Sequence, residues 1–146
     1  MDFADQLRIG ELTKEMVAEE LRLLGDPCAA AAVVVRKALT AALRSAPTGG
    51  APSARLIEDA VKGAMTALLL ADHSLARGAV LVLEAVHDVA GECHLDPTES
   101  MRAALRALAE LRRFVEPARL DDIRLEIEAH YMGAGEVFVG FLRSPV

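Results

Sequence analysis

Hydrophobic positions recur every three or four residues over most of this 146-residue chain. That spacing is the period of an α-helix that buries one face against a core. The interruptions in the pattern separate the helices from one another. We expect helices near 11–24, 27–45, 53–71, 73–91, 97–115 and 118–132, with 136–143 either a continuation or a separate short helix.

Local signals mark the ends of these helices. Asp-Pro at 26–27 and again at 96–97 predicts two helix starts, because Asp caps the first turn and proline's missing N–H costs nothing there. Glu116-Pro117 predicts the end of another helix, because proline disfavours the α-helical conformation for the residue that precedes it. The segment 47–53, PTGGAPS, predicts a loop, and Ser53 is a candidate N-cap.

A polar stripe and an apolar line run along residues 54–92. If this segment were one helix, Asp72 would fall on the apolar face, where a lone carboxylate is costly. We therefore expect the helix to break there, with Asp72 as the N-cap of the next one. The stripe consists of Arg55, Glu58, Lys62, Thr66, His73, Arg77, Glu84, Asp88 and Gly91; the line consists of Val61, Met65, Leu68, Leu75, Ala79, Leu83 and Val86.

The predicted fold is all-α: a compact multi-helix bundle of five to seven helices forming a single helical domain over 1–146. Only VFVGF near the C-terminus has the residue types of a strand. Similar markers in the two halves allow an internal duplication of 5–72 and 73–146 as two three-helix units. The expected core or interface residues are Val33, Val34, Leu39, Leu43, Leu56, Met65, Leu68, Leu75, Val82, Val86, Leu105, Leu108 and Ile127.

Composition adds an expectation of self-association. Hydrophobic residues make up 53% of the chain and aromatic residues only 3%, and the mean hydropathy is +0.28. A chain this small has more apolar side chain than one subunit easily covers. We expect a homo-oligomer, most simply a dimer, formed through the Ala-rich segment 28–43 or the C-terminal segment 131–142.

The charge of the chain and its N-terminal sequence limit which partners and which cellular compartment we expect. A formal net charge of −6 disfavours nucleic acid and an acidic membrane surface, because both draw on clustered Lys and Arg. No apolar run approaches the ~20 residues that span a bilayer. The N-terminus lacks a basic region followed by an apolar run and a cleavage site, so we expect a cytoplasmic protein.

The densest group of potential metal ligands lies in residues 84–96, EAVHDVAGECHLD. Glu84 and His87 have the Glu-x-x-His spacing of carboxylate-bridged sites in helical bundles, and Cys93 and His94 follow. A di-metal site of that kind needs a second Glu-x-x-His, which the chain lacks. We therefore expect no cofactor, and the metal alternative is a divalent ion held by Glu84, His87, Cys93 and His94.

A second alternative is nuclease chemistry. Arg124 and His130 are separated in a way similar to the Arg and His of the HEPN group of small helical ribonucleases, and Tyr131 follows them. The resemblance implies RNA cleavage by this pair. Glu126 and Glu128 lie between them and would repel an RNA phosphate.

No other catalytic pattern is present: the chain has no Gly-rich phosphate loop, no Gly-x-Ser-x-Gly and no Cys-x-x-Cys. We therefore expect a non-enzymatic, oligomeric helical bundle that acts as an interaction, regulatory or small-ligand-binding module, with a protein partner or a small ligand. Metal binding around 84–96 and a HEPN-like ribonuclease are the alternatives.

Overall fold

The computed structural model describes residues 10–16, 26–45, 51–71 and 74–144, and they are almost entirely helical. Residues 10–16 form a helical segment, and the described part of the chain contains no strand, so the all-α prediction is confirmed. The VFVGF segment is helical. The elements are α2 (Pro27–Arg44), α3 (Ala51–Leu70), α4 (Leu75–Glu92), α5 (Pro97–Ala109), the 3-10 helix η1 (Glu110–Arg113), α6 (Pro117–His130) and α7 (Ala134–Arg143).

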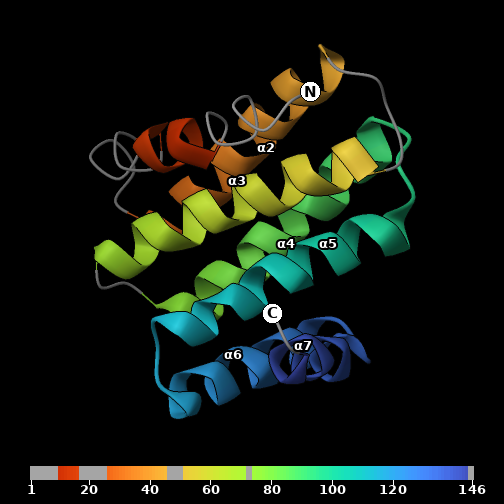
Figure 1. The fold of residues 1–146 in the computed structure, drawn as a ribbon. Coiled ribbons are helices and arrows are strands. Elements are labelled where there is room, and N and C mark those ends of the chain that lie inside the picture. The colour runs from red at the N-terminus through yellow and green to blue at the C-terminus, as the bar shows by residue number, and fades with distance from the viewer. Residues whose placement is uncertain (1–9, 17–25, 46–50, 72–73, 145–146) are drawn as a thin grey trace.

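Helices α2 to α7 of the described residues stack as three consecutive hairpins. Figure 1 shows the hairpin of α2 and α3, then that of α4 and α5, then that of α6 and α7, one layer upon the next. On one side of the stack α4 contacts both α2 and α6, and on the other side α5 contacts both α3 and α7. The middle hairpin is therefore covered on two faces. The predicted duplication of 5–72 and 73–146 stays a prediction, because part of the first unit lies outside the described residues.

Most helix starts follow the local signals of the sequence. Asp26 accepts a hydrogen bond from the backbone N–H of Ala29 (3.3 Å), and Asp96 accepts one from that of Glu99 (3.0 Å). Both are N-caps that satisfy an amide of the first turn, and each precedes a proline at the first helical position.

Two of the predicted caps are wrong. The predicted break after α3 is confirmed, but the N-cap of α4 is Ser74, whose hydroxyl accepts from the N–H of Arg77 at 3.4 Å. Asp72 precedes this cap and lies outside the described residues. Ser53 is not an N-cap either, because α3 already begins at Ala51 and Ser53 is buried inside it.

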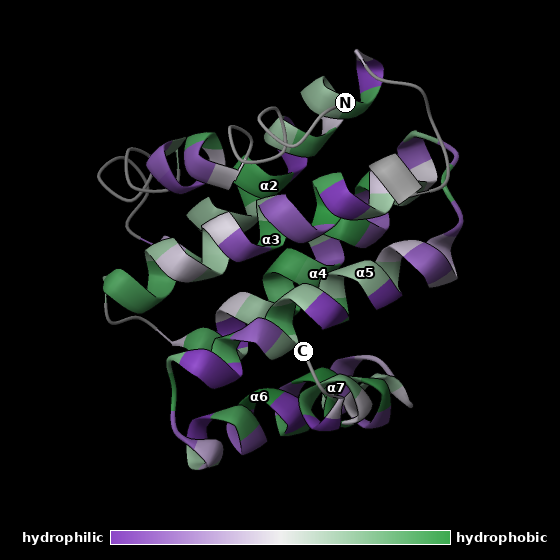
Figure 2. Ribbon diagram, in the orientation of Figure 1, coloured by the Kyte–Doolittle hydropathy of each residue, from purple (hydrophilic) through white to green (hydrophobic). Residues whose placement is uncertain are grey.

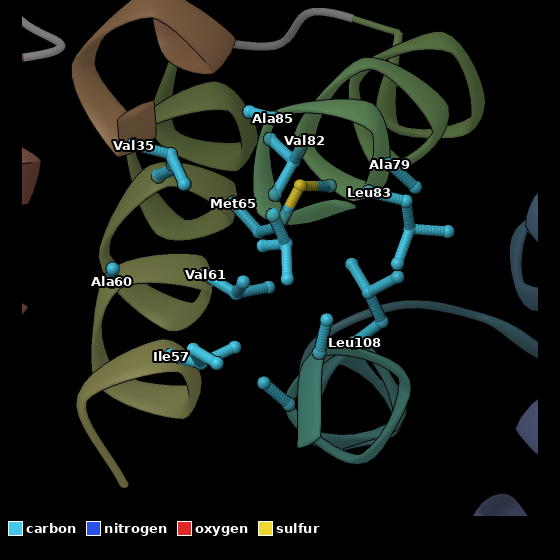
Figure 3. Close-up of a cluster of buried hydrophobic side chains, with 14 of the residues drawn as sticks. Val35, Ile57, Ala60, Val61, Met65, Ala79, Val82, Leu83, Ala85 and Leu108 are labelled. Atoms are coloured by element: carbon cyan, nitrogen blue, oxygen red, sulfur yellow. The ribbon is translucent and has the colours of Figure 1, made fainter. Parts of the chain in front are cut away.

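The core lies between the layers, where side chains of α2, α3, α4 and α5 meet (Figure 3). Met65 of α3 reaches toward Val82 and Leu83 of α4, and Leu108 of α5 closes the cluster from below. All of the predicted core residues are buried except Val33, which is half-buried. Val33 lies at the edge of the buried face, since Arg36 and Lys37 one turn later are exposed.

The predicted apolar line along α3 and α4 is buried in full, and the described members of the polar stripe lie at or near the surface. Figure 2 shows hydrophobic and hydrophilic residues alternating along the helices, so that each presents both kinds of face. In the stripe, Asp88 pairs with Arg36 of α2 at 2.6 Å. None of the helices in the described part of the chain is long and apolar enough to cross a membrane.

Candidate functional site

The four predicted metal ligands are spread over the second half of α4 and the turn that follows it. Glu84 lies near the middle of the helix and His87 about one turn further on, and both are exposed. Cys93 is the C-cap, and its N–H donates to the carbonyl of Val89 at 2.8 Å. His94 has a positive φ of 57°, a left-handed conformation that helix ends usually assign to glycine or asparagine. This turn reverses the chain into α5.

Within the described residues, no three His, Cys, Asp or Glu side chains lie close enough together to hold a metal ion. Cys93 and His94 belong to the turn that follows α4. His87 instead faces a groove on the molecular surface. The metal site of Glu84, His87, Cys93 and His94 stays a prediction.

This groove, which we call the α5–α7 groove, has a volume of about 490 Å³. It lies where the end of α4, the first half of α5 and the turn between α6 and α7 come together. Its lining is mostly apolar and reaches the surface at Met132, whose side chain is 96% exposed. The lining residues are His87, Pro97, Thr98, Met101, Arg102, Leu105, Tyr131, Met132, Gly133, Ala134 and Val137.

Glu128 fixes the turn that forms one wall of the groove. Its two carboxylate oxygens accept hydrogen bonds from the N–H of Gly133 (2.8 Å) and that of Gly135 (3.0 Å). Gly133 has a φ of 86°, which glycine adopts without steric cost. A carboxylate at the first turn of α7 is also favoured by the helix dipole. Met132 and Ala134 are therefore held in place on the groove wall.

Arginines of the α5–η1 segment attach α7 to the bundle. Arg102 and Arg106 both lie over the ring of Phe141, at 5.3 Å and 5.0 Å from its centre. Arg112 donates to the carbonyls of Phe141 (2.7 Å), Leu142 (3.0 Å) and Ser144 (3.2 Å). These carbonyls belong to the last turn and the C-cap of α7, where the helical hydrogen-bond pattern ends, and that of Phe141 also accepts from the Ser144 N–H at 3.2 Å. The groove thus has a second well-fixed wall.

Four polar side chains lie among the apolar residues of the groove: Arg102, His87, Tyr131 and Thr98. Burial raises the pKa of Tyr131, and the negative charges of Glu84 and Asp88 raise it further. The phenol is therefore protonated at neutral pH and can donate a hydrogen bond. Apolar area with a few polar groups at its edge is typical of a binding site.

The residues of the ribonuclease alternative each have a carboxylate neighbour on α6. Arg124 Nε and an Nη atom lie 2.9 Å from Asp121. His130 Nδ1 is 3.0 Å from the carbonyl oxygen of Glu126 and 3.9 Å from its carboxylate. The structure records no contact between Arg124 and His130. The nuclease reading stays a prediction.

The α5–α7 groove was not predicted from the sequence. Of its lining residues, His87 is predicted only as a metal ligand, and Arg102 belongs to no motif of the sequence. Methionines at 101 and 132 and a turn glycine at 133 are weak signals when taken one at a time. Their meaning depends on three segments that meet only in the folded chain.

Comparisons with known proteins add no family: no family model, no curated protein and no solved structure matches this chain. The residues that line the groove therefore carry the functional inference by their geometry and chemistry.

Proposed function

We propose that this chain is a non-enzymatic ligand-binding bundle and that its ligand occupies the α5–α7 groove. The supporting observation is an open, mostly apolar surface hollow that is lined by four polar side chains as well. Its volume of about 490 Å³ falls in the range of small-molecule sites.

Binding here gains free energy by removing apolar surface from water. Met101 and Val137 are partly buried and Met132 is almost fully exposed, so a ligand can still cover part of each side chain. Burial of apolar area contributes about 25 cal/mol per Å² before the costs of association. Methionine side chains are flexible and polarizable, which lets the groove adapt to the shape of its ligand.

A neutral fluorescent probe, N-phenyl-1-naphthylamine, tests the site. We expect saturable binding at one site per chain, weakened by Met132→Glu, which places a charge at the mouth of the groove. Leu125→Glu is the matched control, because Leu125 is also exposed (53%) but does not line the groove. Binding that is non-saturable, or that both variants weaken equally, would contradict the proposal.

The proposal includes a homodimer. Leu70 and Phe114 are large apolar side chains exposed by 74% and 68%. Thr66 and Phe114 line one pocket of about 270 Å³, and Leu70 follows Thr66 by one turn on the same face of α3. This α3–η1 surface, rather than the C-terminal segment, is the better candidate interface, since Phe138 of α7 is fully buried within the chain.

A further inference from the structure

We infer that the α5–α7 groove selects an amphipathic monoanion: a small molecule with an apolar body and one carboxylate-like head, bound through the guanidinium of Arg102. This inference rests on the proposed function and names the class of ligand for the same site. The reasons are that no described carboxylate pairs with Arg102, that negative charges lie near Tyr131, and that the rest of the lining is mostly apolar.

Arg102 differs from its neighbours on the same face. Arg106 pairs with Glu58 at 3.1 Å, and Arg113 pairs with Glu110 at 3.0 Å. Among the residues that the structure describes, no carboxylate pairs with Arg102, whose one recorded contact is the ring of Phe141 at 5.3 Å. Its charge is therefore available to a ligand.

The Phe141 ring also prepares Arg102 for binding. A guanidinium stacked on an aromatic face has fewer orientations than a free one, so less entropy is lost when it forms a bidentate pair with a carboxylate. Arg102 lies next to Met101, so a head group at Arg102 places the attached body directly over the apolar lining.

The charges near Tyr131, another lining residue, disfavour a second anionic head. Glu84 and Asp88 lie near Tyr131, where their negative charges act on its phenol. Asp88 is paired with Arg36 at 2.6 Å, but no described cation pairs with Glu84. An anion is therefore best placed at Arg102, with its apolar body running over Met101 and Val137 toward Met132.

Three ten-carbon amphiphiles with matched chains test the charge preference by calorimetry, each below its micelle-forming concentration: decanoate, decanol and decyltrimethylammonium. We expect decanoate to bind most tightly. Arg102→Gln should weaken decanoate binding about tenfold and leave decanol unchanged, since a hydrogen-bonded charge pair is lost. Arg102→Lys should retain part of the preference. Arg113→Gln is the control, because Arg113 is outside the groove.

The outcomes distinguish a failure of the monoanion inference from a failure of the proposed binding site. If decyltrimethylammonium binds as tightly as decanoate, or if Arg102→Gln leaves decanoate binding intact, the monoanion inference is overturned; the proposed function stands if Met132→Glu still weakens decanol. If no decyl compound binds saturably, both fail. Vesicles of anionic phospholipid should not co-sediment with the protein. Co-sedimentation abolished by Arg102→Gln would assign the head-group site to a membrane and overturn the inference of a small-molecule ligand.

Discussion

Arg77 and Asp26 join the starts of two helices that are far apart in the sequence. Two guanidinium nitrogens of Arg77 donate to the two carboxylate oxygens of Asp26, each at 2.6 Å. Asp26 is also the N-cap of α2, and Arg77 lies in the first turn of α4, where its N–H donates to Ser74. One carboxylate thus holds the first turn of α2 and fixes its position against α4.

This pairing predicts an acid-sensitive contribution to stability. The hydrogen bonds from Arg77, and then that from the Ala29 N–H, lower the pKa of Asp26 from 3.8 to about 2. A lowered folded-state pKa gives stability that is present above pH 3.8 and is lost as the pH falls through about 2. Asp26→Asn should be less stable than the parent at pH 7, with the difference shrinking toward pH 2, as measured by urea unfolding. An equal difference at both pH values would contradict this.

The contribution of Asp59 to stability should have the opposite dependence on pH. Burial raises its pKa from 3.8 to about 6, and its Oδ2 is buried without a hydrogen-bond partner. The folded state binds more protons than the unfolded state between these values, so Asp59 lowers stability as the pH rises from about 4 to 6. Asp59→Asn should therefore raise the urea midpoint at pH 7 and change it little at pH 4. Asp122→Asn, at an exposed position, is the control. A midpoint lowered at pH 7 would contradict the prediction.

The close packing of α3 against the segment 10–16 requires a glycine at position 63. A Cβ at Gly63 would lie 2.5 Å from the carbonyl oxygen of Gly10 and 3.2 Å from the Cβ of Thr13. Backbone cannot yield as a flexible side chain does, so Gly63→Ala should cost about 1–3 kcal/mol of unfolding free energy. Gly140→Ala is the matched control. Nothing lies within 4 Å of its added Cβ, and it should stabilise by about 0.5–1 kcal/mol. Equal effects in chemical denaturation would refute the packing argument.

The predicted metal site has a direct elemental test. Protein purified without an affinity tag should contain zinc, iron and manganese well below one ion per chain. Cys93 and His94 belong to the turn after α4, and no three ligand side chains converge among the described residues. Stoichiometric metal that disappears in both Glu84→Ala and His87→Ala would instead support the metal alternative. Thr98→Ala changes a lining residue of the groove that is not a predicted metal ligand, so it is the control for non-specific effects.

The α3–η1 surface predicts the oligomeric state. Light scattering at micromolar concentration should give twice the chain mass of 15.6 kDa. Phe114→Glu and Leu70→Glu should each shift the protein toward the monomer, because a charge on an apolar interface must be desolvated. Leu125→Glu should not. A monomeric parent protein would show that one subunit covers its own apolar surface.

The sequence by itself determined the helices and their buried faces. Asp26 and Asp96 cap the helices that follow them, and Met65 and Leu83 lie on the predicted apolar line and are buried. These features depend on neighbours within one or two turns, so the residue pattern is enough to specify them. The pattern could not distinguish Asp72 from Ser74 as a cap, since both are good caps two residues apart.

Only the tertiary structure decided which helix faces meet and what forms between them. Glu128 holds the turn after α6 through the N–H groups of Gly133 and Gly135, and Arg102 is stacked on Phe141 from another hairpin. The α5–α7 groove combines His87 with residues of α5 and of the α6–α7 turn. Helical periodicity fixes which residues share a face of one helix, but it holds no information on which other face will pack against it.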